Sequence, residues 1–124
     1  MVVCYKKKCI FIHIPKTAGT SIEHFLTEKG TNHIDFLGVR NNRSLQHLTA
    51  FEMSKILPSF KLFYKFSFVR NPYDRLLSEY YWTTLPIGYK ANKTKTQFLN
   101  YVSNIISKKA YFTNILNDHY IPQY

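Results

Sequence analysis

A short segment holds side chains suited to binding an anion such as a phosphate or a sulfate. It covers residues 15–21 and combines one lysine, three hydroxyl groups and one glycine: Lys16, Thr17, Thr20, Ser21 and Gly19. The lysine adds a point charge, and backbone N–H groups at the start of a helix attract anions. The lysine precedes the glycine, so the segment is no Walker A loop and a nucleotide kinase is disfavoured. The alternative is a capped helix that binds no ligand.

A second segment places an arginine and a serine eight positions apart, Arg70 and Ser78. An arginine at the end of a strand can bind an anion through two parallel hydrogen bonds. The alternative is a structural ion pair between Arg70 and Asp74 or Glu79. On its own, this segment favours the structural ion pair.

Strands and helices are predicted around both segments. Residues 9–14 form an apolar run typical of a buried strand in a parallel sheet, and helical spacing resumes beyond the loop at Ile22, Phe25 and Leu26. Residues 64–69 predict a second strand. Because ligands bind at the carboxyl ends of parallel strands, we expect the two segments to share one site.

Further helices are indicated by capping residues. Asn71 as N-cap and Pro72 as first helical residue predict a helix after the second strand. Thr49 with Glu52 predicts a capping box for a helix over 49–57. Amphipathic spacing predicts helices over 98–106 and 111–116, and residues 30–44 predict a weak strand or a loop.

Composition limits the class of protein. A chain of 124 residues with 45% hydrophobic and 17% aromatic residues fits one α/β domain over residues 1–124 and excludes intrinsic disorder. Two cysteines are too few for a disulfide scaffold or a structural zinc site. We find no signal peptide and no transmembrane run, which predicts a cytoplasmic protein with free thiols. The net charge of +10 favours an anionic partner.

Together the two segments resemble the cofactor signatures of the sulfotransferases, most closely the branch that modifies carbohydrates. The matching stretches are residues 11–21, Phe-Ile-His-Ile-Pro-Lys-Thr-Ala-Gly-Thr-Ser, and residues 68–81. The resemblance implies a three-layer, P-loop-like α/β fold with a short parallel sheet. It also implies a donor, 3′-phosphoadenosine 5′-phosphosulfate (PAPS), and no metal. The implied phosphosulfate loop is Lys16, Thr17, Ala18, Gly19, Thr20 and Ser21. The implied 3′-phosphate pair is Arg70 and Ser78.

The resemblance also covers a segment around His47 and one that contains His119 and Gln123. It implies that His47 is the catalytic base and that His119 and Gln123 lie near the acceptor. His119, Glu52 and Glu23 are the alternatives for the base, and His13 is expected to be a core residue near the loop. The chain corresponds to the first, cofactor-binding half of a usual family domain.

We therefore expect a sulfotransferase that moves a sulfuryl group from PAPS to a hydroxyl, with Lys16 and His47 as catalytic residues. The expected acceptor is a carbohydrate, and an anionic one suits the charge. A catalytically incomplete module that binds PAPS or its product is an alternative. A basic nucleic-acid-binding domain is a third reading, supported by charge alone and disfavoured. The sequence leaves the oligomeric state open.

Overall fold

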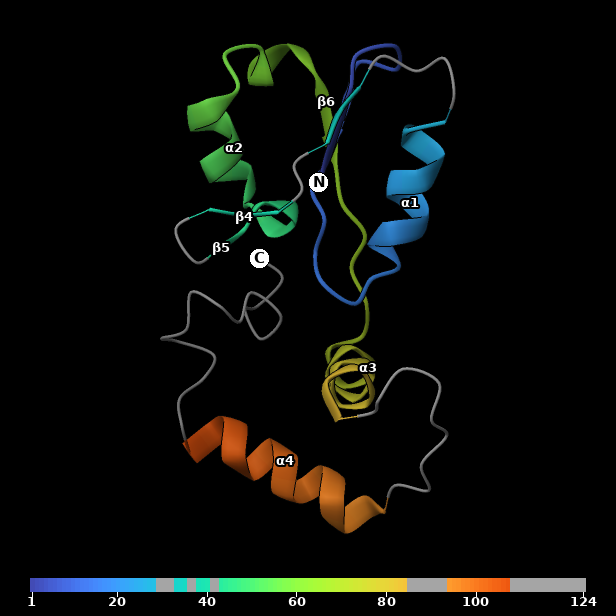
Figure 1. Cartoon of the computed structure of the whole chain (residues 1–124), viewed down its shortest axis with the longest axis vertical. Coiled ribbons are helices and arrows are strands. Elements are labelled where there is room, and N and C mark those ends of the chain that lie inside the picture. The colour runs from blue at the N-terminus through green and yellow to red at the C-terminus, as the bar shows by residue number, and fades with distance from the viewer. Residues whose placement is uncertain (29–32, 36–37, 41–42, 85–93, 108–124) are drawn as a thin grey trace. The chain divides into compact units, whose positions relative to one another are not determined.

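The computed structural model describes residues 1–28, 33–35, 38–40, 43–84 and 94–107, and the chain divides into two units, Met1–Val69 and Arg70–Tyr124 (Figure 1). In chain order, the first unit holds β1 (Val2–Cys4), β2 (Cys9–Phe11), α1 (Gly19–Leu26), β3 (His33–Asp35), β4 (Val39–Arg40), β5 (Arg43–Ser44), the 3-10 helix η1 (Leu45–His47), α2 (Ala50–Ile56), the 3-10 helix η2 (Phe60–Leu62) and β6 (Tyr64–Phe66). The second unit holds α3 (Pro72–Thr84) and α4 (Lys95–Ser107). The expectation that all 124 residues form one domain stays a prediction.

The four strands of the main sheet lie in the order β3-β1-β2-β6. Strand β2 runs parallel to β6, with Cys9 opposite Tyr64, whereas β1 is antiparallel to both β2 and β3. The sheet is therefore mixed, and the prediction of a parallel sheet was wrong for β1 and β3. The reason is a tight turn between β1 and β2, in which the Lys8 N–H donates to the Tyr5 carbonyl at 3.2 Å.

Each face of this sheet carries its own apolar cluster. Because side chains alternate along a strand, Val2 and Phe11 face one side and Val3 and Ile10 face the other. The first cluster includes Leu26 of α1 and the second includes Met53 and Leu57 at α2. Helices α1 and α2 accordingly lie on opposite faces of the sheet, as Figure 1 shows. This confirms the mixed α/β class.

Both strands that lead to the candidate site are shorter than predicted. We expected strands over 9–14 and 64–69, and the structure ends them at Phe11 and Phe66. The Ile12 N–H still donates to the Phe66 carbonyl at 2.9 Å. Beyond it, the hydroxyl of Ser67 donates to the Ile12 carbonyl at 2.8 Å, where a ladder would use a backbone N–H. The segments that follow β2 and β6 therefore leave the sheet together and remain neighbours at this edge.

The helix-capping predictions are confirmed. Thr49 and Glu52 form both halves of a capping box at the start of α2. The side chain of Asn71 accepts a hydrogen bond from the Tyr73 N–H at 2.9 Å, at the start of α3. The predicted helix over 98–106 corresponds to α4, and the one over 111–116 lies outside the described residues.

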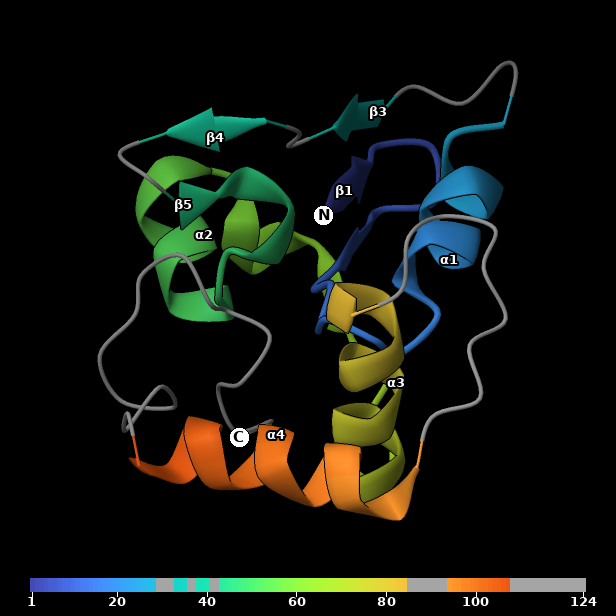
Figure 2. The ribbon, with the colours of Figure 1, turned by 60° about the horizontal axis from the view of Figure 1, so that its bottom comes forward.

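Within the second unit, α3 packs against α4 through aromatic rings (Figure 2). The buried ring of Tyr80 lies 5.3 Å from that of Phe98 and 5.0 Å from that of Tyr101. Arg75 and Glu79 are also buried on α3. Burial lowers the pKa of Arg75, and the charge of Glu79 acts in the opposite direction.

Among the helices that the structure describes, none has the length and the apolar character needed to span a membrane.

Candidate active site

The loop between β2 and α1 has an uncommon backbone. Lys16 and Ala18 both have positive φ angles, 65° and 64°, separated by Thr17. A non-glycine residue in this left-handed region costs on the order of 1 kcal/mol or more and persists where the surrounding structure imposes it. Left-handed residues in a tight turn before a helix direct backbone N–H groups toward one side, which is how anion-binding nests form. The loop geometry therefore fits the anion site that the residue types predicted.

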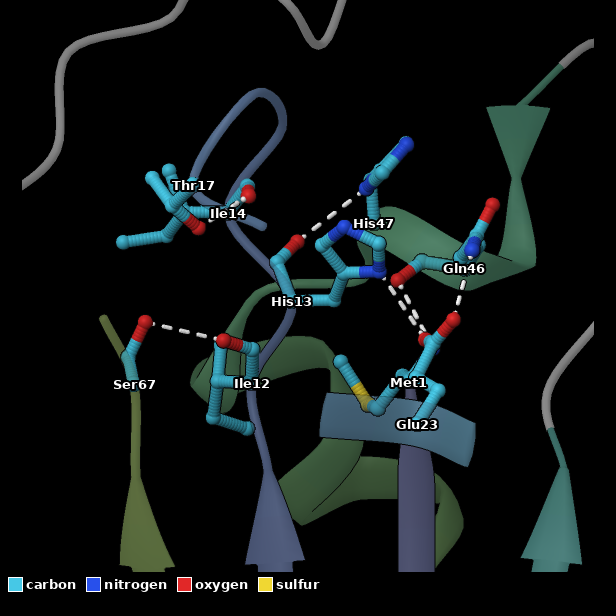
Figure 3. A network of polar contacts seen from close by, with 9 residues as sticks. All are labelled: Met1, Ile12, His13, Ile14, Thr17, Glu23, Gln46, His47 and Ser67. Carbon is cyan, nitrogen blue, oxygen red and sulfur yellow. Dashed lines mark hydrogen bonds and ion pairs between the residues drawn. The ribbon is translucent and has the colours of Figure 1, made fainter. Parts of the chain in front are cut away.

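The side chains of this loop divide into two groups. The Thr17 hydroxyl is buried and donates to the Ile14 carbonyl at 2.8 Å, which closes the loop on itself (Figure 3). Its hydroxyl hydrogen is thus engaged within the protein. Thr20 and Ser21 are exposed on the first turn of α1, and Lys16 is half-buried. Of the predicted hydroxyl donors, Thr20 and Ser21 are the two that face solvent.

Gly19 is required by a close approach of the His13 ring. A Cβ atom built on Gly19 would lie 2.1 Å from both Cδ2 and Nε2 of His13. No side-chain carbon fits there, so the ring packs directly on the backbone where α1 begins. His13 is buried, as expected for a residue near the loop.

His47 also contacts the His13 ring. It ends η1 and is half-buried, and its Nδ1 lies 3.1 Å from the His13 carbonyl oxygen. A carbonyl only accepts, so Nδ1 carries the hydrogen and the lone pair of the neutral ring is on Nε2. The two rings meet edge to face at 4.7 Å. His47 thus sits beside the residues that lead into the loop, in the tautomer that a base acting through Nε2 needs.

The buried carboxylate of Glu23 connects the segment of His13 with the 3-10 helix η1 (Figure 3). Glu23 of α1 accepts a hydrogen bond from Nδ1 of His13 at 2.9 Å and one from Nε2 of Gln46 at 2.7 Å. It also forms an ion pair with the amino group of Met1. Burial acts to raise the pKa of Glu23, but the contacts with His13, the Met1 amine and Gln46 outweigh burial and lower the pKa to about 2.

This low pKa predicts an acid-sensitive contribution to stability. The ordinary pKa of 4.5 applies to the unfolded chain, so Glu23 stabilises the fold fully above that pH and progressively less as the pH falls toward about 2. The full effect is about 3 kcal/mol. In urea unfolding between pH 5 and pH 3, we expect the unfolding free energy to fall less steeply for Glu23→Gln than for the wild type. Equal slopes would contradict the prediction.

The carboxylate alternatives for the base are both engaged elsewhere. Glu52 accepts hydrogen bonds from the backbone N–H and the hydroxyl of Thr49, each at 2.8 Å. Glu23 is buried with a low pKa, so it binds a proton weakly near neutral pH. The geometry therefore favours His47 over either carboxylate. His119 and Gln123 lie outside the described residues.

The predicted 3′-phosphate pair belongs to the second unit. Arg70 is exposed just before α3, and Ser78 is half-buried within that helix. Arg70 follows the segment 67–69, which leaves the sheet beside Ile12. The structure brings His47, His13 and Glu23 together in the first unit, with Lys16 on the adjoining loop.

Sequence reasoning missed the contact between Glu23 and Gln46. The residue types present Glu23 only as an alternative base, and Gln46 only as part of the segment around His47. A signal was present, because Glu23 shares the buried face of α1 with Gly19 and Leu26. A glutamate on an apolar face needs a partner. The sequence does not show that the partners come from distant segments.

A comparison with known protein families identifies the class of enzyme. The chain matches the Sulfotransferase family over residues 1–124, and it belongs to that family of PAPS-dependent transferases. No curated protein and no solved structure gives a significant match. Among the described residues, no three His, Cys, Asp or Glu side chains gather as a metal site requires. Family membership establishes the class of enzyme and leaves the acceptor open.

Proposed function

We propose that this protein transfers a sulfuryl group from PAPS to a hydroxyl of a carbohydrate. The main support is the left-handed loop at Lys16 and Ala18, placed between a buried strand and the helix that starts at Gly19. Such a loop suits the 5′-phosphosulfate, because its N–H groups, the helix start and Lys16 all favour negative charge. The β-strand, loop and helix order also supports the P-loop-like fold that the sequence predicts.

His47 suits the role of base in this reaction. The acceptor oxygen would form a bond to sulfur while the bond between sulfur and the bridging phosphate oxygen breaks. The electron pair leaves with 3′-phosphoadenosine 5′-phosphate, and the acceptor proton passes to Nε2 of His47. Lys16 would stabilise the charge that develops on the bridging oxygen. The hydrogen bond from Nδ1 of His47 to the His13 carbonyl keeps Nε2 ready to accept that proton.

Arg70 and Ser78 would bind the 3′-phosphate. Support comes from the parallel pairing of β2 and β6, since both lead into their loops at the same edge of the sheet. Arg70 is exposed, as a residue that binds a ligand from solvent must be. A carbohydrate acceptor, and an anionic one in particular, is supported by the charge of +10.

Calorimetric titration with 3′-phosphoadenosine 5′-phosphate tests the donor site. We expect a micromolar dissociation constant. Arg70→Ala should weaken binding by about 30-fold or more, because a charged, bidentate contact to the phosphate is lost. Lys95→Ala removes an exposed cation from the same unit and should leave the affinity within about twofold.

An unchanged affinity in Arg70→Ala would contradict the assignment of the 3′-phosphate site. Turnover of labelled PAPS with a panel of glycans tests the reaction itself. Nucleotide binding without turnover would identify a binding module. Tight, salt-sensitive binding of duplex DNA without nucleotide binding would instead identify a nucleic-acid-binding domain.

A further inference from the structure

We propose that Glu23 and Gln46 form a positioning bridge that fixes His47 beside the phosphosulfate loop for sulfuryl transfer. The inference rests on the proposed function and adds two positioning residues to it. The bridge joins α1, which begins at the loop, to η1, which carries His47.

Both oxygens of the Glu23 carboxylate take part in the bridge. Oε1 accepts from Nδ1 of His13 at 2.9 Å, and Oε2 accepts from Nε2 of Gln46 at 2.7 Å. Figure 3 shows the carboxylate between these two side chains. Along the chain, His13 lies 10 positions from Glu23 and Gln46 lies 23 positions from it. The Glu23 side chain therefore binds two segments at the same time. One is the segment after β2 that leads into the loop, and the other is the 3-10 helix η1.

Gln46 transmits this restraint to His47, because the two residues are adjacent in η1. His47 has a second restraint, since its Nδ1 donates to the His13 carbonyl and its ring contacts the His13 ring. His13 is itself held by Glu23. Two sets of contacts therefore connect His47 to the Glu23 carboxylate. One runs through Gln46 and the backbone of η1, and the other runs through His13.

The bridge is strong because Glu23 is buried and charged. Glu23 is 8% exposed, so water can hardly take the place of a hydrogen-bond partner that is removed. Hydrogen bonds to a carboxylate are about twice as strong as those between neutral groups. A base displaced by about 1 Å can lower a rate by about 100-fold. We therefore expect the bridge to act on kcat through the placement of His47.

A double-mutant cycle on kcat tests the bridge. Gln46→Ala removes one half-buried contact and keeps the charge of Glu23 paired with His13. We expect kcat to fall about 10-fold to 100-fold, with the KM for PAPS within about threefold. His47→Ala should lower kcat further, and the double variant should be no slower than His47→Ala alone.

Two matched variants serve as controls. Gln97→Ala removes a side chain of the same type from a helix start, and Glu28→Gln removes an exposed glutamate beyond α1. Both should keep kcat within about twofold. If Gln46→Ala lowers kcat by the same factor with and without His47, the bridge does not act through His47 and the proposal is wrong.

A readout that is independent of turnover separates this inference from the proposed function. Nitrogen-15 NMR of the imidazoles should show His47 in a single tautomer, hydrogen on Nδ1, in the wild type and a mixture in Gln46→Ala. If the wild type shows the fixed tautomer and no sulfuryl transfer, the proposed function fails and the bridge stands. If the His47 signals do not change in Gln46→Ala, the bridge is overturned, whatever the activity.

Discussion

Replacing Lys16 by alanine should lower kcat for sulfuryl transfer by about 1,000-fold. In the proposed reaction, the ammonium group would lie beside the oxygen on which charge develops, and one such contact in a site without water contributes about 4 kcal/mol to stabilisation of the transition state. The loss should appear mainly in kcat, because the charge grows as the sulfur–oxygen bond breaks. Steady-state kinetics with labelled PAPS measures both constants.

Lys8 provides a matched control for Lys16. It also has a positive φ, 49°, but it lies in the exposed turn between β1 and β2. Lys8→Ala makes the same chemical change in the same backbone region, so any cost of placing alanine there is shared. We expect this variant to keep kcat within about twofold. A Lys16→Ala enzyme as active as the Lys8→Ala enzyme would remove Lys16 from the chemistry.

Replacing Gly19 by alanine should destabilise the first unit by about 2 kcal/mol or more, because overfilling a packed site forces its neighbours to move. The new Cβ would overlap the His13 ring, at 2.1 Å from two of its atoms. The ring cannot move freely, since Glu23 holds its Nδ1 at 2.9 Å. Urea unfolding measures this loss, and activity should fall with it because His47 contacts the same ring.

The clash predicts that the effect of Gly19→Ala changes sign when His13 is truncated. With alanine at position 13, the ring is absent, and Gly19→Ala should become neutral or stabilise the protein by up to about 1 kcal/mol through helix propensity. Unfolding free energies of the two single variants and the double variant form the test. An equal loss in both backgrounds would show that the His13 ring is not the cause.

Capping residues made the helices predictable, whereas the sheet was only half predictable. Thr49 with Glu52 and Asn71 with Pro72 act within one turn of the chain, so their effect can be read from neighbouring residues. The turn between β1 and β2 contains no glycine or asparagine and puts Lys8 at positive φ instead. Without that usual signal, the sequence contains no local indication of a hairpin, and β1 was missed.

The loop was predictable from its residue types, but the network behind it was not. Lys16 and the hydroxyls follow each other along the chain, and the proposed anion site would use backbone groups of the same segment. The contacts of Glu23 with His13 and Gln46 join three segments. Such pairings depend on how α1 and η1 pack on the sheet, which no local pattern shows. The hydrogen bond from Ser67 to the Ile12 carbonyl, just beyond the ends of β2 and β6, likewise joins distant segments.

The mixed sheet has a consequence for the order of folding. The hairpin of β1 and β2 closes across one tight turn, whereas the contact between Ile12 and Ser67 joins residues 55 positions apart. Closing the longer loop costs more chain entropy, so β6 should dock after the hairpin has formed. The segment of β6 that lies beside the proposed phosphosulfate loop would thus pack late. Only molecules in which β6 has docked would then bind the nucleotide, so nucleotide binding would measure the fully folded fraction and would not detect partly folded intermediates.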